Sequence, residues 1–149
     1  MLIRTHLAIT LFVILLFVTH VNNPLTFVII TLIATMLPDV DSAFSTLGKG
    51  KQWRILQFLV EHRGPIHSLT FTITLSIILS FFFPTLAFGF FLGYATHLFV
   101  DSFTKEGIIP FWPYDKKSKG PLKTGGVIES GVFLMFLLTD VFLAIFVLL

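Results

Sequence analysis

The sequence contains no cysteine and little charge: of its 149 residues only 12% are charged, whereas 55% are hydrophobic. A soluble domain carries roughly a quarter charged residues, so this composition excludes a soluble protein and predicts an integral membrane protein. Without cysteine, any metal site must do without thiolate ligands. No internal repeat or low-complexity tract is visible either, which predicts a single membrane-embedded domain over residues 1–149.

The sequence consists largely of long apolar runs. Five of them cover residues 5–21, 24–37, 66–83, 85–100 and 128–149. A helix needs roughly 20 apolar residues to cross the hydrocarbon core, so we predict an all-α bundle of about five transmembrane helices, the second of them short. The first run lacks an A-x-A-like cleavage site, which favours a retained span over a signal peptide. "VNNP" and "FPT" predict tight turns that make two antiparallel hairpins.

Two longer polar connections join the spans, over residues 39–65 and 101–127. The first contains "KQWRILQFLVEHR", whose apolar spacing predicts a short interfacial helix; the second is predicted to be a long, irregular loop. All 10 Lys and Arg residues lie at the amino terminus or in these connections. The positive-inside rule therefore predicts a protein of the inner (cytoplasmic) membrane, with its amino terminus cytoplasmic and its carboxyl terminus outside. Anionic headgroups explain the basic residues, so no nucleic-acid partner is expected.

Ionisable residues gather at the cytoplasmic ends of the predicted spans. They are His6, Asp39, Asp41, His62, His67, His97, Asp101 and Glu129. Ionisable groups at the membrane edge are candidates for a functional site, because burying them without a partner costs several kcal/mol. His20 falls at the opposite membrane face and is left out. Asp140 lies about 16 Å deeper than Glu129 along a helix, and we expect it to hydrogen-bond within the bundle.

Each short motif also has a structural interpretation. "HLFVD" places His97 and Asp101 one helical turn apart, which alone is more typical of a hydrogen-bonded pair than of a metal site. "LPDVD" offers two carboxylates to one cation, but an ordinary solvated helix end has the same pattern. In "HRGPIH", Pro65 is predicted at the first position of a helix and His67 in its first turn. The alternative for "HRGPIH" is a histidine-rich turn at the level of the lipid headgroups. His6, taken alone, is an ordinary polar residue near the amino terminus.

Convergence is what favours a metal centre. Four of the 5 histidines and several carboxylates come from every span to one membrane face. Imidazole and carboxylate ligands suit a divalent metal, zinc first and manganese or iron as alternatives. The donors outnumber the ligands of one tetrahedral ion, so one or two ions are predicted. Arg63 adds a planar guanidinium group, which is suited to bind phosphate or carboxylate. Trp112 in "GIIPFWP" is predicted to anchor a lid or interfacial edge.

Four motifs together resemble the YdjM-like family of small inner-membrane proteins, described as predicted metal-dependent hydrolases. They are "LPDVD", "HRGPIHSL", "GYATHLFVDSFTKEGIIPFWP" and "GGVIES", in the family's order. The resemblance implies metal ligands at His6, Asp39, Asp41, His62, His67, His97 and Asp101, with Glu129 as a further candidate. Ser42 stands where family members often have a histidine, so no strong ligand is expected there. The HxxxD element is also similar, more loosely, to one in zinc-dependent phospholipase C.

The leading hypothesis is a membrane-embedded metal-dependent hydrolase that acts on a phosphoester or lipid at the cytoplasmic face. Arg63 would hold an anionic headgroup, and Asp39 or Glu129 would serve as general base. Membrane lipid and anionic headgroups are the expected partners. The alternatives are a cation-binding transporter and a structural membrane protein stapled by metal. Two features argue against a transporter. The ionisable groups lie at only one membrane face, and the two halves of the sequence are not related by an internal repeat.

Overall fold

The computed structural model describes residues 1–41, 50 and 64–148, and this part of the chain is helical. Its elements are α1 (Ile3–Phe17), the 3₁₀ helix η1 (Val18–His20), α2 (Pro24–Met36), the 3₁₀ helix η2 (Leu37–Asp41), α4 (Leu69–Phe82), α5 (Pro84–Ser102) and α6 (Val127–Leu148). The prediction of an all-α protein is confirmed for this part. The connection after α5 is more ordered than predicted, because isolated β-bridges join Thr104 to Leu122 and Ile108 to Ser118. The predicted interfacial helix lies outside the described residues.

Among the described residues, two helices are long and apolar enough to cross a membrane, over Ile3–His20 and Val127–Val147. The apolar helices Pro24–Val40 and Leu69–Phe82 are shorter. Both predicted hairpin turns are confirmed, since α2 begins at Pro24 and α5 at Pro84. Proline suits the first turn of a helix because the N–H that it lacks would have no intrahelical partner there.

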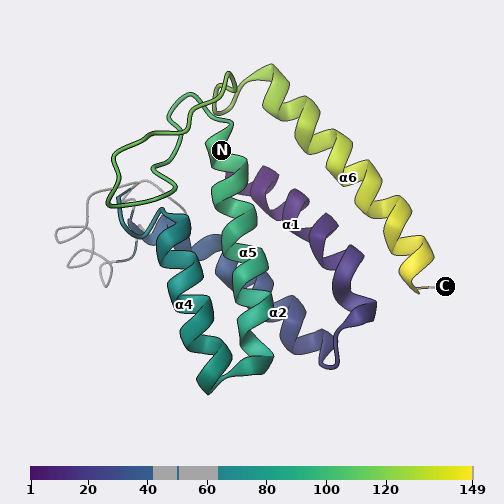
Figure 1. The fold of residues 1–149 in the computed structure, drawn as a ribbon. Helices are drawn as coiled ribbons and strands as arrows, with labels where there is room; N and C mark the ends of the chain where they lie inside the picture. The colour runs from purple at the N-terminus through teal and green to yellow at the C-terminus, as the bar shows by residue number, and fades with distance from the viewer. Residues whose placement is uncertain (42–49, 51–63, 149) are drawn as a thin grey trace.

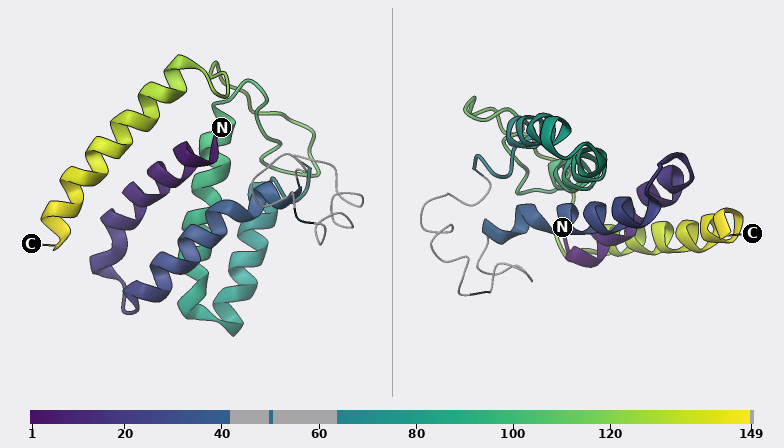
Figure 2. Two further views of the ribbon diagram at one scale, coloured as in Figure 1. Left: turned by 180° about the vertical axis from the view of Figure 1, so that it is seen from behind. Right: turned by 90° about the horizontal axis from the view of Figure 1, so that it is seen from below.

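Helix α5 lies at the centre of the arrangement (Figure 1), where it packs against α2, α4 and α1. Helix α6 lies beside α1 and runs in the same direction (Figure 2). At one end of the bundle, the start of α1 meets the end of α5 and the start of α6 (Figure 1). The end of α2 and the start of α4 lie at that end too. This is the end at which the sequence places its candidate site.

The contact between α5 and α2 depends on two glycines one helical turn apart. A Cβ atom added at Gly93 would lie 2.2 Å from the carbonyl oxygen of Thr31, and one at Gly89 would lie 3.1 Å from Thr31 Oγ1. The backbones can approach this closely only because neither glycine has a side chain, as in small-xxx-small contacts between membrane helices. This close approach brings α5, which carries His97 and Asp101, against the backbone of α2.

We expect Gly93→Ala to destabilise the protein by about 1–3 kcal/mol, because the new methyl group would overlap the backbone of α2. Gly131→Ala is the matched control: it is also a helical glycine, but its added Cβ meets nothing within 4 Å. Thermal unfolding in detergent, followed by circular dichroism, measures both. Equal midpoints for the two variants would contradict the close α2–α5 contact.

Candidate metal centre

Helix α5 contributes His97 and Asp101, which are both buried. His97 Nε2 lies 3.7 Å from Asp101 Oδ2. The other ring nitrogen, Nδ1, lies 2.8 Å from the backbone carbonyl oxygen of Thr35. A carbonyl oxygen only accepts hydrogen bonds, so Nδ1 carries the proton and Nε2 keeps its lone pair toward the carboxylate. This is the arrangement by which metal-binding histidines are usually oriented.

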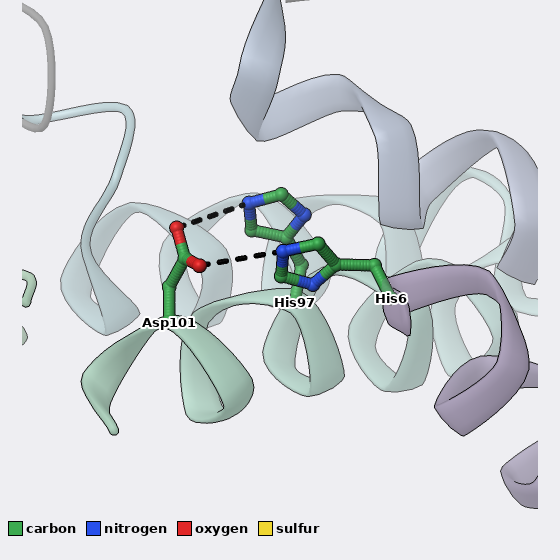
Figure 3. A group of neighbouring side chains, drawn as sticks. All are labelled: His6, His97 and Asp101. Carbon is green, nitrogen blue, oxygen red and sulfur yellow. Dashed lines mark ion pairs between the residues drawn. The ribbon is translucent and has the colours of Figure 1, made fainter. Parts of the chain in front are cut away.

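Helix α1 brings His6 to the same place. Its ring stacks on that of His97, with centroids 4.0 Å apart and planes 7° apart. Its Nε2 atom lies 3.3 Å from Asp101 Oδ1. Figure 3 shows both rings presenting a nitrogen to the one carboxylate, His6 from α1 and His97 from α5. The α-amino group of Met1 also donates to Asp101 Oδ1.

Two further donors complete the cluster. His67 Nε2 lies 3.8 Å from Asp101 Oδ2, and Asp39 Oδ1, from η2, lies 3.8 Å from His97 Nε2. The prediction that Pro65 and His67 occupy the first turn of a helix is wrong. Helix α4 begins at Leu69 with Ser68 as its N-cap, whose side chain accepts a hydrogen bond from the N–H of Phe71. His67 therefore lies before the helix.

These five side chains form two overlapping triads, His6–His97–Asp101 and Asp39–His67–His97. Within each triad, the donor atoms all lie within 4.8 Å of one another. Metal bonds of about 2.0–2.2 Å in a tetrahedron place ligand atoms about 3.3–3.6 Å apart, close to the observed separations. Both triads use His97, whose Nδ1 is already occupied by Thr35. Since one nitrogen lone pair binds one ion, His97 can serve only one metal, so the two triads cannot both be filled with all their donors.

The polar atoms of the cluster fit a cation. Among the described residues, neither ring nitrogen of His6 makes a hydrogen bond, and neither does Nε2 of His97, although both side chains are buried. Buried polar atoms without a partner are rare because each costs free energy. A divalent cation would satisfy these nitrogens and favour the ionised carboxylates.

The sequence profile of the YdjM inner membrane protein family matches residues 1–148, almost the whole chain. The chain belongs to this family. Comparison with curated proteins and with solved structures found no match. Membership confirms the resemblance that the motifs suggested. Four of the five residues of the His/Asp cluster lie in motifs that carried it: Asp39 in "LPDVD", His67 in "HRGPIHSL", and His97 and Asp101 in "GYATHLFVDSFTKEGIIPFWP".

Three candidate residues of this YdjM-family chain fall outside what the structure describes. His62 and Arg63 lie outside the described residues, and for Asp41 only the backbone, in η2, is described. Their predicted roles stay predictions. His20 lies on η1, at the opposite end of α1, as expected. The expected hydrogen bond of Asp140 is wrong: its carboxylate is buried on α6 but has no hydrogen-bond partner among the described residues.

Glu129, predicted as a general base, is placed beside the cluster rather than in either triad. One carboxylate oxygen accepts hydrogen bonds from the Leu2 N–H (2.7 Å) and the Thr5 hydroxyl (2.9 Å). The other accepts from the Gly125 N–H at 2.6 Å. Glu129 therefore ties the start of α6 to the start of α1, where anions are favoured, and Thr5 directly precedes His6. These hydrogen bonds hold the start of α1, next to His6, against the start of α6, and the role of Glu129 as a general base stays a prediction.

The sequence interpretation missed the groups that orient the ligands, namely the carbonyl of Thr35 and the hydroxyl of Thr5. A backbone acceptor has no signature in the sequence, so nothing could have indicated Thr35. Thr5 offered a weak signal, since it is a hydroxyl residue directly next to the candidate ligand His6. Both were hidden because their partners lie far away along the chain.

We expect Glu129→Gln to weaken metal binding by about tenfold, because outer partners of metal ligands contribute about 10–100-fold in affinity. An amide cannot accept on both sides, so one hydrogen bond to α1 or to Gly125 is lost. Glu106→Gln is the control: Glu106 is exposed and accepts from Thr124 Oγ1 at 3.1 Å, far along the chain from His6. Competition against a chelating dye measures both affinities. Unchanged affinity in Glu129→Gln would contradict a role of Glu129 in positioning His6.

Proposed function

We propose that this protein is a membrane-embedded metal-dependent hydrolase. The observation that carries the proposal is the convergence of three histidines and two aspartates in two triads that share His97. Histidine and carboxylate ligands of this kind suit zinc, with manganese and iron as alternatives. Zinc sites in hydrolases characteristically combine such ligands with one position left for water.

The proposed topology follows the charge distribution. The five helices would all span or enter the membrane, with the short α2 and α4 shielded by their neighbours. The loop between α5 and α6 lies at the end of the bundle where α5 ends and α6 begins (Figure 1), and it carries exposed lysines, among them Lys105, Lys117 and Lys123. Because basic loops stay in the cytoplasm, the centre would lie at the cytoplasmic face of the inner membrane.

The two aspartates differ in a way that suits different roles. The Asp101 side chain is 3% exposed and contacts three imidazoles, whereas that of Asp39 is 23% exposed. Asp101 is therefore suited to hold the ligands together. Asp39 is suited to accept the proton of a water molecule entering from the open side, as a general base. A divalent cation bound here would lower the pKa of that water and polarise the scissile group.

A phosphoester, and above all a phospholipid, is the proposed substrate class. The centre lies beside apolar helices, and the basic residues of the loop would attract an anionic headgroup. Arg63 is proposed to hold that headgroup through its planar fork. The close spacing of Arg63 and His67 in the sequence supports this role.

Near-complete burial favours a second candidate, a metal-stapled structural protein. His6, His67 and His97 are at most 1% exposed. Structural zinc sites are closed in this way, whereas catalytic sites keep a position open to water. The partial exposure of Asp39 favours the hydrolase over the structural protein that metal only stabilises.

Turnover by metal-loaded protein separates these candidates. We would purify the protein in detergent, strip it with a chelator, reload it with zinc or manganese, and assay a soluble phosphodiester and a phospholipid. A hydrolase gains activity on reloading and loses it on chelation. Bound metal without turnover on either substrate would instead support the structural staple. Protein that binds no metal would overturn both.

A further inference from the structure

An apolar groove of about 600 Å³ lies between α1 and α5, and Phe136 of α6, Leu69 of α4 and the loop residues Ile108, Pro110 and Ser118 also line it. Its walls include Ile9, Phe12, Val13, Ala95, Phe99 and Phe136. A smaller hollow of about 180 Å³ shares Ile9, Phe99 and Phe136 with it, and Met1 and Leu122 line that hollow. The groove therefore continues toward the end of the bundle at which the His/Asp cluster lies.

The walls indicate what occupies the groove. Helices α1 and α6 are the two long candidate spans, and nearly all of α6 is left uncovered by protein. A groove between two spans opens toward bilayer hydrocarbon, where no water is available to fill it. Its lining is almost wholly apolar, and its volume lies within the roughly 300–1,000 Å³ of small-molecule sites. An acyl chain is the abundant apolar ligand at that depth.

The end of the groove near the cluster is basic. Ser118 lines the groove and is flanked by Lys117 and Lys119, while Leu122 lines the smaller hollow and is followed by Lys123. These lysines are exposed. An apolar groove bordered by a loop that carries exposed lysines is complementary to a lipid with an anionic headgroup.

The same end of the groove reaches the proposed centre. Met1 lines the smaller hollow, and its α-amino group donates to Asp101. Ile9 lies one helical turn after His6 on α1 and lines both hollows. A lipid with its chain in the groove would therefore have its headgroup beside α1 and Asp101.

We propose that this groove is the acyl-chain site of an anionic membrane phospholipid. That the bound lipid is also the substrate rests on the hydrolase function proposed above. The groove lies on the side of α5 that carries Ala95 and Phe99, whereas His97 and Asp101 face α2 and α1. The groove can therefore be blocked without touching a metal ligand.

Ala95→Phe is the test, because the added ring would fill part of the groove. Ser80→Phe is the matched control: Ser80 is a small, exposed residue on α4 that lies outside the groove. Both proteins would be reconstituted with phosphatidylglycerol, extracted into detergent and analysed for retained lipid by native mass spectrometry. We expect Ala95→Phe to retain about tenfold less lipid than wild type and Ser80→Phe to retain as much. Equal retention by all three proteins would overturn the proposal, as would equal loss in both variants.

Headgroup selectivity is a second readout that does not depend on filling the groove. Lys119→Gln with Lys123→Gln should reduce the preference for phosphatidylglycerol over phosphatidylcholine, by about fivefold for each lysine. An unchanged preference would overturn the placing of the headgroup among these lysines.

Activity separates the substrate claim from the proposed function. Ala95→Phe should lose hydrolysis of phosphatidylglycerol in vesicles by about tenfold, yet keep hydrolysis of a soluble phosphodiester and its metal content. If wild type hydrolyses neither substrate, the hydrolase proposal fails, while lipid retention still tests the groove. If Ala95→Phe loses lipid retention but hydrolyses vesicle lipid normally, the groove lipid is not the substrate.

Discussion

Asp101→Asn is expected to remove the bound metal, with affinity falling by more than about 100-fold and turnover falling to background. Asp101 contacts the Nε2 atoms of all three histidines of the cluster, at 3.3–3.8 Å. Removing a residue that only hydrogen-bonds to a metal ligand lowers metal affinity by about 10–100-fold. Removing the carboxylate that contacts three candidate ligands should therefore lower the affinity further. The neutral amide also lacks the negative charge that attracts a cation to these nitrogens. Metal content after dialysis, measured by mass spectrometry, gives the result.

Asp140→Asn is the control for general destabilisation. Asp140 is also buried, but it lies on α6 away from both triads. This variant should keep the wild-type metal content. If both variants lose metal equally, the effect of Asp101→Asn would reflect a weakened fold, and the assignment of Asp101 as the central ligand would be contradicted.

Asp39→Asn should lower turnover by at least about 100-fold while most of the metal stays bound. General base catalysis contributes about 10²–10⁴-fold to a rate, and an amide cannot accept the proton. The triad His6–His97–Asp101 does not include Asp39, so it should still hold the ion. Single-turnover hydrolysis of a soluble phosphodiester by zinc-loaded protein, with bound zinc counted in the same sample, measures both quantities.

The exposed loop residue Asp115 provides the matched control, because Asp115→Asn removes the same charge from the described loop away from the cluster. Its turnover and metal content should equal those of wild type. Loss of metal and turnover together in Asp39→Asn would make Asp39 a ligand without a separate role as base. Normal turnover with normal metal would contradict its role as base.

The composition and the apolar runs were enough to predict the helices of this fold. Apolar runs and proline-marked turns follow from the local sequence, so the starts of α2 and α5 were predicted to within one residue. The start of α4 was not. Ser68 competes as a helix cap, since its hydroxyl accepts from the N–H of Phe71, and this moves the first turn beyond His67.

The site was predictable in its members but not in its geometry. His6, Asp39, His67, His97 and Asp101 were singled out because each ends an apolar run at the same face, and the structure brings these five together. Their individual roles depend on contacts between helices. Glu129 was predicted as a general base from its place in the sequence, and its hydrogen bonds to Leu2 and Thr5 of the α1 end could not be predicted from it. The close approach at Gly93, which sets α5 against α2, likewise depends on a residue more than 60 positions away, since Thr31 and Gly93 are paired only in space.

X-ray absorption spectroscopy at the zinc edge of the loaded protein tests the central claim most directly. The account predicts a first shell of nitrogen and oxygen atoms at about 2.0–2.2 Å without sulfur, together with the outer-shell scattering of at least two imidazole rings. His97→Ala should remove one of those rings from the spectrum. A shell of oxygen atoms alone, with no imidazole scattering, would show that zinc binds elsewhere and would contradict a metal centre at the His/Asp cluster.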